Sequence, residues 1–174
     1  MSFLLQRAAL RGLWAMAFWL AGASPALCAD DKVRPVFDPR LGSAFVGVSG
    51  HARKLLEKAS CGKVFEEFRD SRSGLPLSAR LSESGTSAAE HFSSLRFRDG
   101  TGTALCRQAN VQAHTTIGGS TVFVCPAQLF ALAERDRLAA SAILVHETLH
   151  TLGLGENPPL PSEITRRIVN ECGW

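Results

Sequence analysis

The segment from Leu138 to Gly153 limits the possible folds of this chain more than any other. Its apolar residues recur every three or four positions, as on one face of an α-helix. They are Leu138, Ala142, Val145, Leu149 and Leu152. A second line beside this stripe carries His146 and His150, so both imidazoles emerge at the border of a buried face. Gly153 ends the helix, and the prolines between 158 and 161 exclude its continuation.

The residues before this helix favour a small β-sheet. NVQAHTTIGGSTVFVCP, residues 110–126, holds two strand-like runs around Gly118-Gly119, a dipeptide suited to a tight hairpin turn. A two-residue turn there sets His114 opposite Phe123, where it serves as a packing or surface residue. SSLRFRDG, residues 93–100, predicts another strand.

Helical spacing predicts an early helix over residues 43–58 and a short last helix capped by Ser162. The helix with the two histidines is then preceded by a hairpin and followed by a short C-terminal helix. The pattern therefore predicts a single α+β domain over residues 30–174.

Residues 1–29 have the layout of a secretory signal peptide. Arg7 and Arg11 precede an apolar run over 13–23, which is too short to cross about 30 Å of hydrocarbon, and no other stretch is long enough. We favour cleavage after Ala29, although Ala23 and Ala26 also offer small residues, and we expect a secreted or periplasmic protein. Cleavage lowers the basic residues from 19 to 17 against 16 acidic ones, a net charge of about +1. This near neutrality argues against nucleic acid or an anionic membrane as the partner.

The cysteines predict a disulfide framework. Cleavage after Ala29 leaves Cys61, Cys106, Cys125 and Cys172, an even number in an oxidising compartment, so we expect two disulfides. The spacing is not that of a zinc ribbon. Three pairings are open, and we favour 125–172 with 61–106, because the first bridge would fasten the chain end to the histidine-bearing helix.

The run HETLHTLGLGE, residues 146–156, carries the candidate chemistry. Histidines four apart on a helix can aim both rings at one point about 2 Å from each nitrogen, where zinc fits. Glu147 lies about 100° round the helix from His146, too far to be a ligand but able to act as a general base on water.

This run resembles the zincin metallopeptidases, and its extension H-x-x-G-x-x-E is similar to the metzincin signature. The resemblance implies a zinc site of His146, His150 and Glu156, with Glu147 as base. It also implies a sheet whose edge strand binds extended peptide, for which the run Thr121–Cys125 is the candidate.

Two departures from the metzincin pattern leave alternatives open. Metzincins carry a methionine turn, whereas Met1 and Met16 are the only methionines here and both lie in the leader. The third ligand in metzincins is usually histidine, and the glutamate here invites comparison with gluzincins, which leaves Glu163 as an alternative ligand. The chain has no tyrosine, so the oxyanion must be stabilised by zinc itself, Asn157 or His114.

The function predicted from these features is that of an exported zinc hydrolase acting as a monomer on a peptide or protein substrate. The alternative is a secreted, disulfide-stapled binding or structural module that holds a structural metal or none. His51 and His91 have no partner at ligand spacing, and we expect both on the surface.

Overall fold

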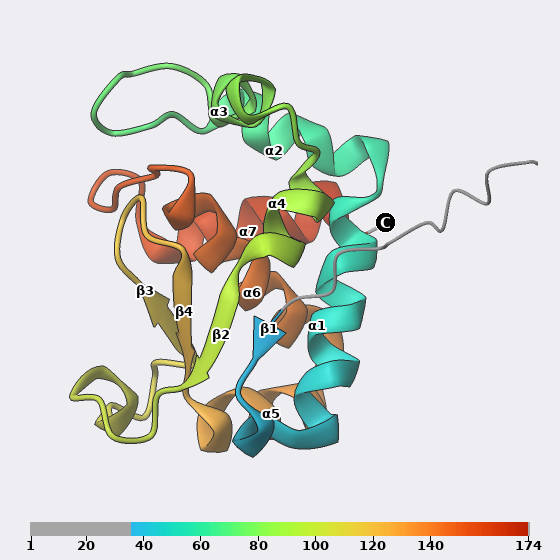
Figure 1. Ribbon diagram of the computed structural model, residues 1–174, viewed down its shortest axis with the longest axis vertical. Helices are drawn as coiled ribbons and strands as arrows, with labels where there is room; N and C mark the ends of the chain where they lie inside the picture. The colour runs from blue at the N-terminus through green and yellow to red at the C-terminus, as the bar shows by residue number, and fades with distance from the viewer. Residues whose placement is uncertain (1–35, 174) are drawn as a thin grey trace, which may run out of the picture. The chain divides into compact units, whose positions relative to one another are not determined.

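A computed structural model of the protein describes residues 36–173 (Figure 1). The expected leader, residues 1–29, and Cys28 lie outside them. The α-helices are α1 (Gly42–Leu56), α2 (Gly62–Glu67), α3 (Leu77–Ser84), α4 (Ala88–Ser94), α5 (Pro126–Arg135), α6 (Arg137–Thr151) and α7 (Pro161–Cys172). The strands are β1 (Val36–Phe37), β2 (Arg96–Asp99), β3 (Ala113–Thr115) and β4 (Thr121–Val124). Short 3-10 helices cover Pro39–Leu41, Ala59–Cys61 and Leu105–Arg107. This part of the chain is an α+β domain, which confirms the predicted fold class.

The four strands form one mixed sheet in the order β1-β2-β4-β3. β1, β2 and β4 run parallel, and β3 pairs antiparallel with β4. β3 is therefore the edge next to β4. The expectation that Thr121–Cys125 forms the edge is wrong, because Thr121–Val124 has a partner strand on both sides.

The hairpin has the predicted register, with His114 opposite Phe123. Its turn is centred one residue earlier than expected, on Ile117 and Gly118. The Gly119 N–H donates to the Thr116 carbonyl at 2.8 Å, and Gly118 has a φ of 73°, a conformation that glycine adopts without strain. The Gly118 N–H also donates to the His150 carbonyl at 2.9 Å, which fixes the hairpin tip to the end of α6.

The core lies between the sheet and the helices. Phe97, Val122 and Val124 are buried on one face of the sheet, whereas Arg96 and Arg98 are exposed on the other. The Phe97 ring lies 5.1 Å from the Phe45 ring of α1, which joins the sheet to the helical layer.

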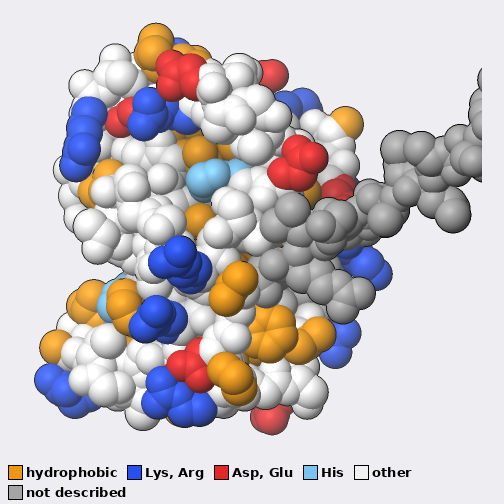
Figure 2. Space-filling model, in the orientation of Figure 1, with side chains coloured by type: hydrophobic (Ala, Val, Ile, Leu, Met, Phe, Trp, Pro, Cys, Tyr) orange, Lys and Arg blue, Asp and Glu red, His pale blue; other side chains and the backbone are white. Residues whose placement is uncertain are grey.

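On the face of the molecule drawn in Figure 2, basic and acidic side chains are interspersed.

Helix α6 packs between α1 and α7 and runs behind the sheet (Figure 1). Asp136 caps its start by accepting from the Ala139 N–H at 2.9 Å. Its end follows the prediction, because Gly153 takes up a φ of 111°.

Helix α7 begins earlier than predicted. Pro161 is its first residue and Leu160 its cap, because proline lacks only an N–H that the first turn cannot use. Ser162 therefore lies inside the helix instead of capping it, while Ile164 and Ile168 are buried as expected. In residues 36–173, no helix is long and apolar enough to cross a membrane.

Two disulfides are present, but the favoured pairing is wrong. The bridges are Cys61–Cys172 and Cys106–Cys125. Helix α7 packs against the turn that holds Cys61, which places its last residue beside that turn. The loop after β2 leaves the sheet at the same end as Cys125, where the Gly100 N–H donates to the Val124 carbonyl at 2.7 Å.

The two remaining histidines are not free surface residues, contrary to expectation. His51 Nδ1 lies 3.0 Å from the Ser141 hydroxyl, and His91 Nε2 lies 2.9 Å from the Thr151 hydroxyl. Both residues are half-buried, and these two contacts reach α6 from α1 and from α4. Each histidine therefore ties a neighbouring helix to α6.

Candidate metal centre and its cleft

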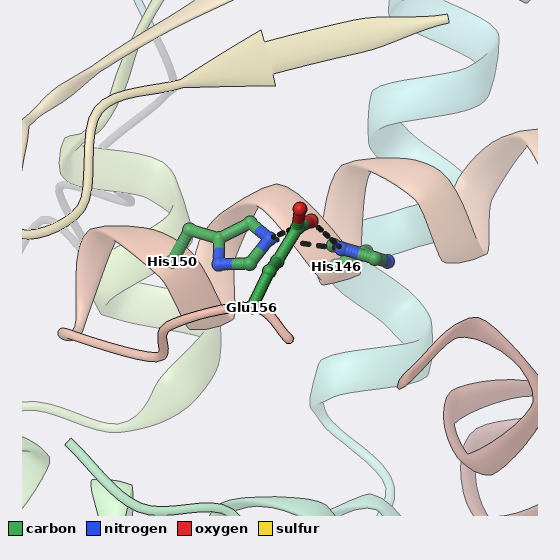
Figure 3. A group of neighbouring side chains, drawn as sticks. All are labelled: His146, His150 and Glu156. Atoms are coloured by element: carbon green, nitrogen blue, oxygen red, sulfur yellow. Dashed lines mark hydrogen bonds and ion pairs between the residues drawn. The ribbon is translucent and has the colours of Figure 1, made fainter. Parts of the chain in front are cut away.

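Three side chains converge at the carboxyl end of α6: those of His146, His150 and Glu156 (Figure 3). The histidines are one helical turn apart, so their rings lie side by side with their Nε2 atoms 2.9 Å apart. After Gly153 the chain turns back, and Glu156 Oε1 lies 3.1 Å from His150 Nε2 and 3.4 Å from His146 Nε2. The group could hold a metal ion.

The atoms of this group that could bind a metal are two imidazole nitrogens and one carboxylate oxygen, and they direct lone pairs toward one another. The His150 Nδ1–H donates to the Leu154 carbonyl at 2.8 Å, so a neutral His150 presents a lone pair at Nε2. That lone pair faces both the Glu156 carboxylate and His146 Nε2. If His146 carries a proton on Nε2, that proton can be donated to His150 or to Glu156. The His150 nitrogen and the Glu156 oxygen then still face each other as two acceptors.

The residues fit a zinc ion in type and spacing. Two imidazoles and a carboxylate are a donor set that zinc accepts. Zinc–nitrogen bonds of about 2.0–2.1 Å in a tetrahedral site put neighbouring donors about 3.3 Å apart. The observed separations of 2.9, 3.1 and 3.4 Å lie close to this value.

The first ligand candidate is positioned by α7. His146 Nδ1 lies 2.9 Å from the Thr165 hydroxyl, which can accept the Nδ1 proton and leave Nε2 free for a metal. Burial and the neighbouring His150 lower the pKa of His146 to about 4, so its ring is neutral at pH 7 and able to bind a cation.

Glu147 lies on α6 beside the group and belongs to the lining of the same cleft. Its side chain is buried, and the Thr115 backbone of the edge strand hydrogen-bonds to its carboxylate. Burial and the Glu156 carboxylate raise the pKa of Glu147 to about 8, against the effect of that hydrogen bond. Because the Thr115 backbone is one donor, the Glu147 carboxylate keeps a further lone pair that can accept a proton.

The turn that presents Glu156 is held by the Asp70–Leu75 hairpin, and no sequence pattern indicated that these two segments meet. The Ser71 N–H and hydroxyl both donate to the Gly153 carbonyl, at 2.9 and 3.0 Å. Asp70 forms a β-bridge with Leu154, and its carboxylate covers Gly153. Both contacts join residues more than 80 positions apart, so local spacing carries no signal for them.

A cleft of about 920 Å³ opens over the group. One wall is residues 110–115 and Ile117, including the whole edge strand β3, and the other is the first part of α7, including Thr165 and Arg166. The edge strand and the candidate metal group thus share one cleft, as the zincin resemblance implies.

The other candidate residues are distributed as follows. His114 lines the cleft, with its ring stacked on Phe123 at 5.2 Å and Nε2 3.0 Å from the Thr103 hydroxyl. Asn157 is exposed and does not belong to the cleft lining. The Glu163 carboxylate accepts from the Leu160 N–H at 3.0 Å, at the start of α7, and is not part of the His146 group.

The chain was compared with models of protein families, with curated proteins and with solved structures. No family model, curated protein or solved structure matches it. The functional assignment therefore depends on the geometry of the site.

Proposed function

We propose that the protein is an exported zinc-dependent peptidase. The observation that carries this proposal is the convergence of three lone-pair donors, His146, His150 and Glu156, in a cleft that also holds Glu147. The two disulfides support export, because such bridges persist in oxidising compartments.

The edge strand supports a peptide as the substrate. The Cys125 N–H donates to the Gln112 carbonyl, and hydrogen-bonded pairs alternate along an antiparallel ladder, so Ala113 and Thr115 turn their backbone polar groups away from β4. The Thr115 backbone reaches Glu147. The remaining groups on this edge can add an extended peptide as a further strand beside Glu147.

The proposed reaction is hydrolysis of a peptide bond. Zinc, when bound, supplies a Lewis acid that polarises the carbonyl and makes water acidic. Glu147, whose pKa a cation on the neighbouring group would lower from about 8, accepts the proton of the attacking water as an ionised carboxylate and returns it to the leaving amine. Thr115 orients the Glu147 carboxylate, and His114 lies in the same cleft, from where it can donate to the developing oxyanion.

The decisive experiment separates zinc binding from catalysis. In Glu147→Gln the amide keeps the volume of the side chain and leaves the ligands in place, but it cannot accept the proton. We expect stoichiometric zinc and an unchanged unfolding transition, with the rate of peptide cleavage lowered by roughly 10²–10⁴. Zinc is measured by elemental analysis and cleavage by mass spectrometry of a peptide library.

Two controls accompany this variant. His146→Ala should lose zinc and activity together, while Glu163→Gln, which alters a glutamate outside the group, should keep both. Cleavage by Glu147→Gln at the wild-type rate would refute the role of Glu147. If zinc binds but wild type cleaves no peptide, the disulfide-stapled module with a structural metal becomes the better description.

A further inference from the structure

Arg166 is a charged residue of the cleft that has no partner among the described side chains. It is exposed on α7 and is the one Lys or Arg among the residues that line the cleft. Within residues 36–173 it forms no ion pair and no side-chain hydrogen bond. The next residue, Arg167, pairs with Glu67 at 2.6 Å and Glu171 at 4.0 Å.

The helix offers Arg166 one carboxylate within reach, and that carboxylate is engaged elsewhere. Glu163 lies three residues earlier, at a spacing that allows an ion pair on a helix. Its carboxylate instead accepts from the Leu160 N–H at 3.0 Å at the helix start. The Arg166 guanidinium is therefore available to bind a group in the cleft.

The balance of charges around the cleft also indicates that Arg166 lacks a partner among the described residues that line it. Its acidic residues are Glu147 and Glu156, and its basic residue is Arg166. A divalent cation on the His146 group offsets both carboxylates, and the charge of Arg166 then has no counterpart in the lining. A guanidinium in this position matches a carboxylate, which it can bind through two parallel N–H···O bonds.

We infer that Arg166 selects peptide substrates that carry a carboxylate close to the cleaved bond. This inference rests on the peptidase function proposed above. Arg166 follows Thr165, whose hydroxyl contacts His146 at 2.9 Å, so the carboxylate binds on the α7 side of the metal group. The opposite wall holds Leu105, Val111 and Ile117, and takes apolar parts of the substrate.

The carboxylate can come from the end of a peptide or from an Asp or Glu side chain, and three peptide libraries distinguish these sources. The first contains short acetylated peptides without Asp or Glu, with a free carboxyl end. The second is the same library as C-terminal amides. The third is the amide library with Glu at one varied position. Zinc-loaded wild type should cleave the first or the third about 10- to 100-fold more efficiently, in kcat/KM, than the second.

A matched pair of variants assigns that preference to Arg166. Arg166→Gln should bring the ratio of kcat/KM values close to one, and Arg166→Lys should restore part of it. Arg167→Gln carries the same substitution one residue away, on a side chain outside the cleft lining, and should keep the wild-type ratio. A wild-type ratio near one, or equal ratios in both glutamine variants, would overturn the inference.

A binding experiment tests the inference without catalysis. The zinc-loaded Glu147→Gln protein is dialysed to equilibrium against the same libraries, and the retained peptides are identified by mass spectrometry. Peptides with a carboxylate should be enriched, and adding Arg166→Gln should remove the enrichment while adding Arg167→Gln should not. If wild type cleaves nothing but this enrichment is present, the peptidase proposal fails and the carboxylate site stands. Absence of enrichment refutes the carboxylate site.

Discussion

Gly153 is the residue on which the position of Glu156, the proposed third ligand, depends. Its φ of 111° strains any other residue, and a Cβ built at this position would lie 2.7 Å from Asp70 Cγ. Asp70 cannot easily move aside, because it accepts from the Arg72 N–H at 2.8 Å and pairs with Arg80 at 3.5 Å. Gly153→Ala therefore combines two separate penalties.

The magnitude follows from a comparison with Gly74 in the neighbouring hairpin. Gly74 has a φ of 69°, and a Cβ there would meet nothing within 4 Å, so Gly74→Ala measures backbone strain alone. We expect that strain to cost about 1–2 kcal/mol. Gly153→Ala adds the overlap with Asp70, about 1–3 kcal/mol, for a total of about 2–5 kcal/mol.

The free energy of unfolding of each variant is measured by urea denaturation in the presence of a chelator, so that zinc does not contribute. A double-mutant cycle with Asp70→Ala should return a coupling energy close to the overlap cost. Zinc affinity, measured separately, should fall in Gly153→Ala and stay unchanged in Gly74→Ala, because the first substitution displaces the turn that presents Glu156. If Gly153→Ala is no more destabilising than Gly74→Ala, the contact with Asp70 does not constrain this turn.

Further substitutions test the ligand set and the disulfides. Glu156→Gln should weaken zinc binding strongly while Glu163→Gln leaves it unchanged, as read by competition with a chromophoric chelator, and the opposite result would move the site to the gluzincin-like arrangement. Mass spectrometry should find no free thiol in the oxidised domain. Replacing both Cys61 and Cys172 by Ala should cost about 1.5 kcal/mol more in unfolding free energy than removing the other bridge, because their separation of 111 residues closes a longer loop than one of 19. Equal losses would contradict this loop-length argument.

The sequence predicts those parts of the site that depend on local geometry. The helical period determines that His146 and His150 share one face, and Gly153 determines where the chain turns back. The register of the hairpin was also predictable, because strand pairing across a short turn sets His114 opposite Phe123 even though the turn is centred one residue away from the expected glycines.

The rest of the site depends on tertiary packing, for which one sequence gives no signal. Thr165 is 19 residues from His146 and became its partner because α7 packs against α6. Ser71 supports Gly153 from 82 residues away. The prediction of the disulfide pairing was wrong for the same reason, because the pairing depends on which elements meet in space and not on the spacing of the cysteines.

Helix α6 buries several polar side chains, and the three that face the cleft are each held by a different part of the chain. Burying such groups is costly unless they are hydrogen-bonded, and no buried side-chain nitrogen or oxygen in residues 36–173 lacks a partner. α7 supplies Thr165 to His146, the edge strand supplies Thr115 to Glu147, and the turn supplies Leu154 to His150. The fold itself therefore sets the positions of both imidazoles and of the Glu147 carboxylate. A neutral His150 turns its Nε2 lone pair toward the Glu156 carboxylate at 3.1 Å, and this is the contact that a bound cation would relieve.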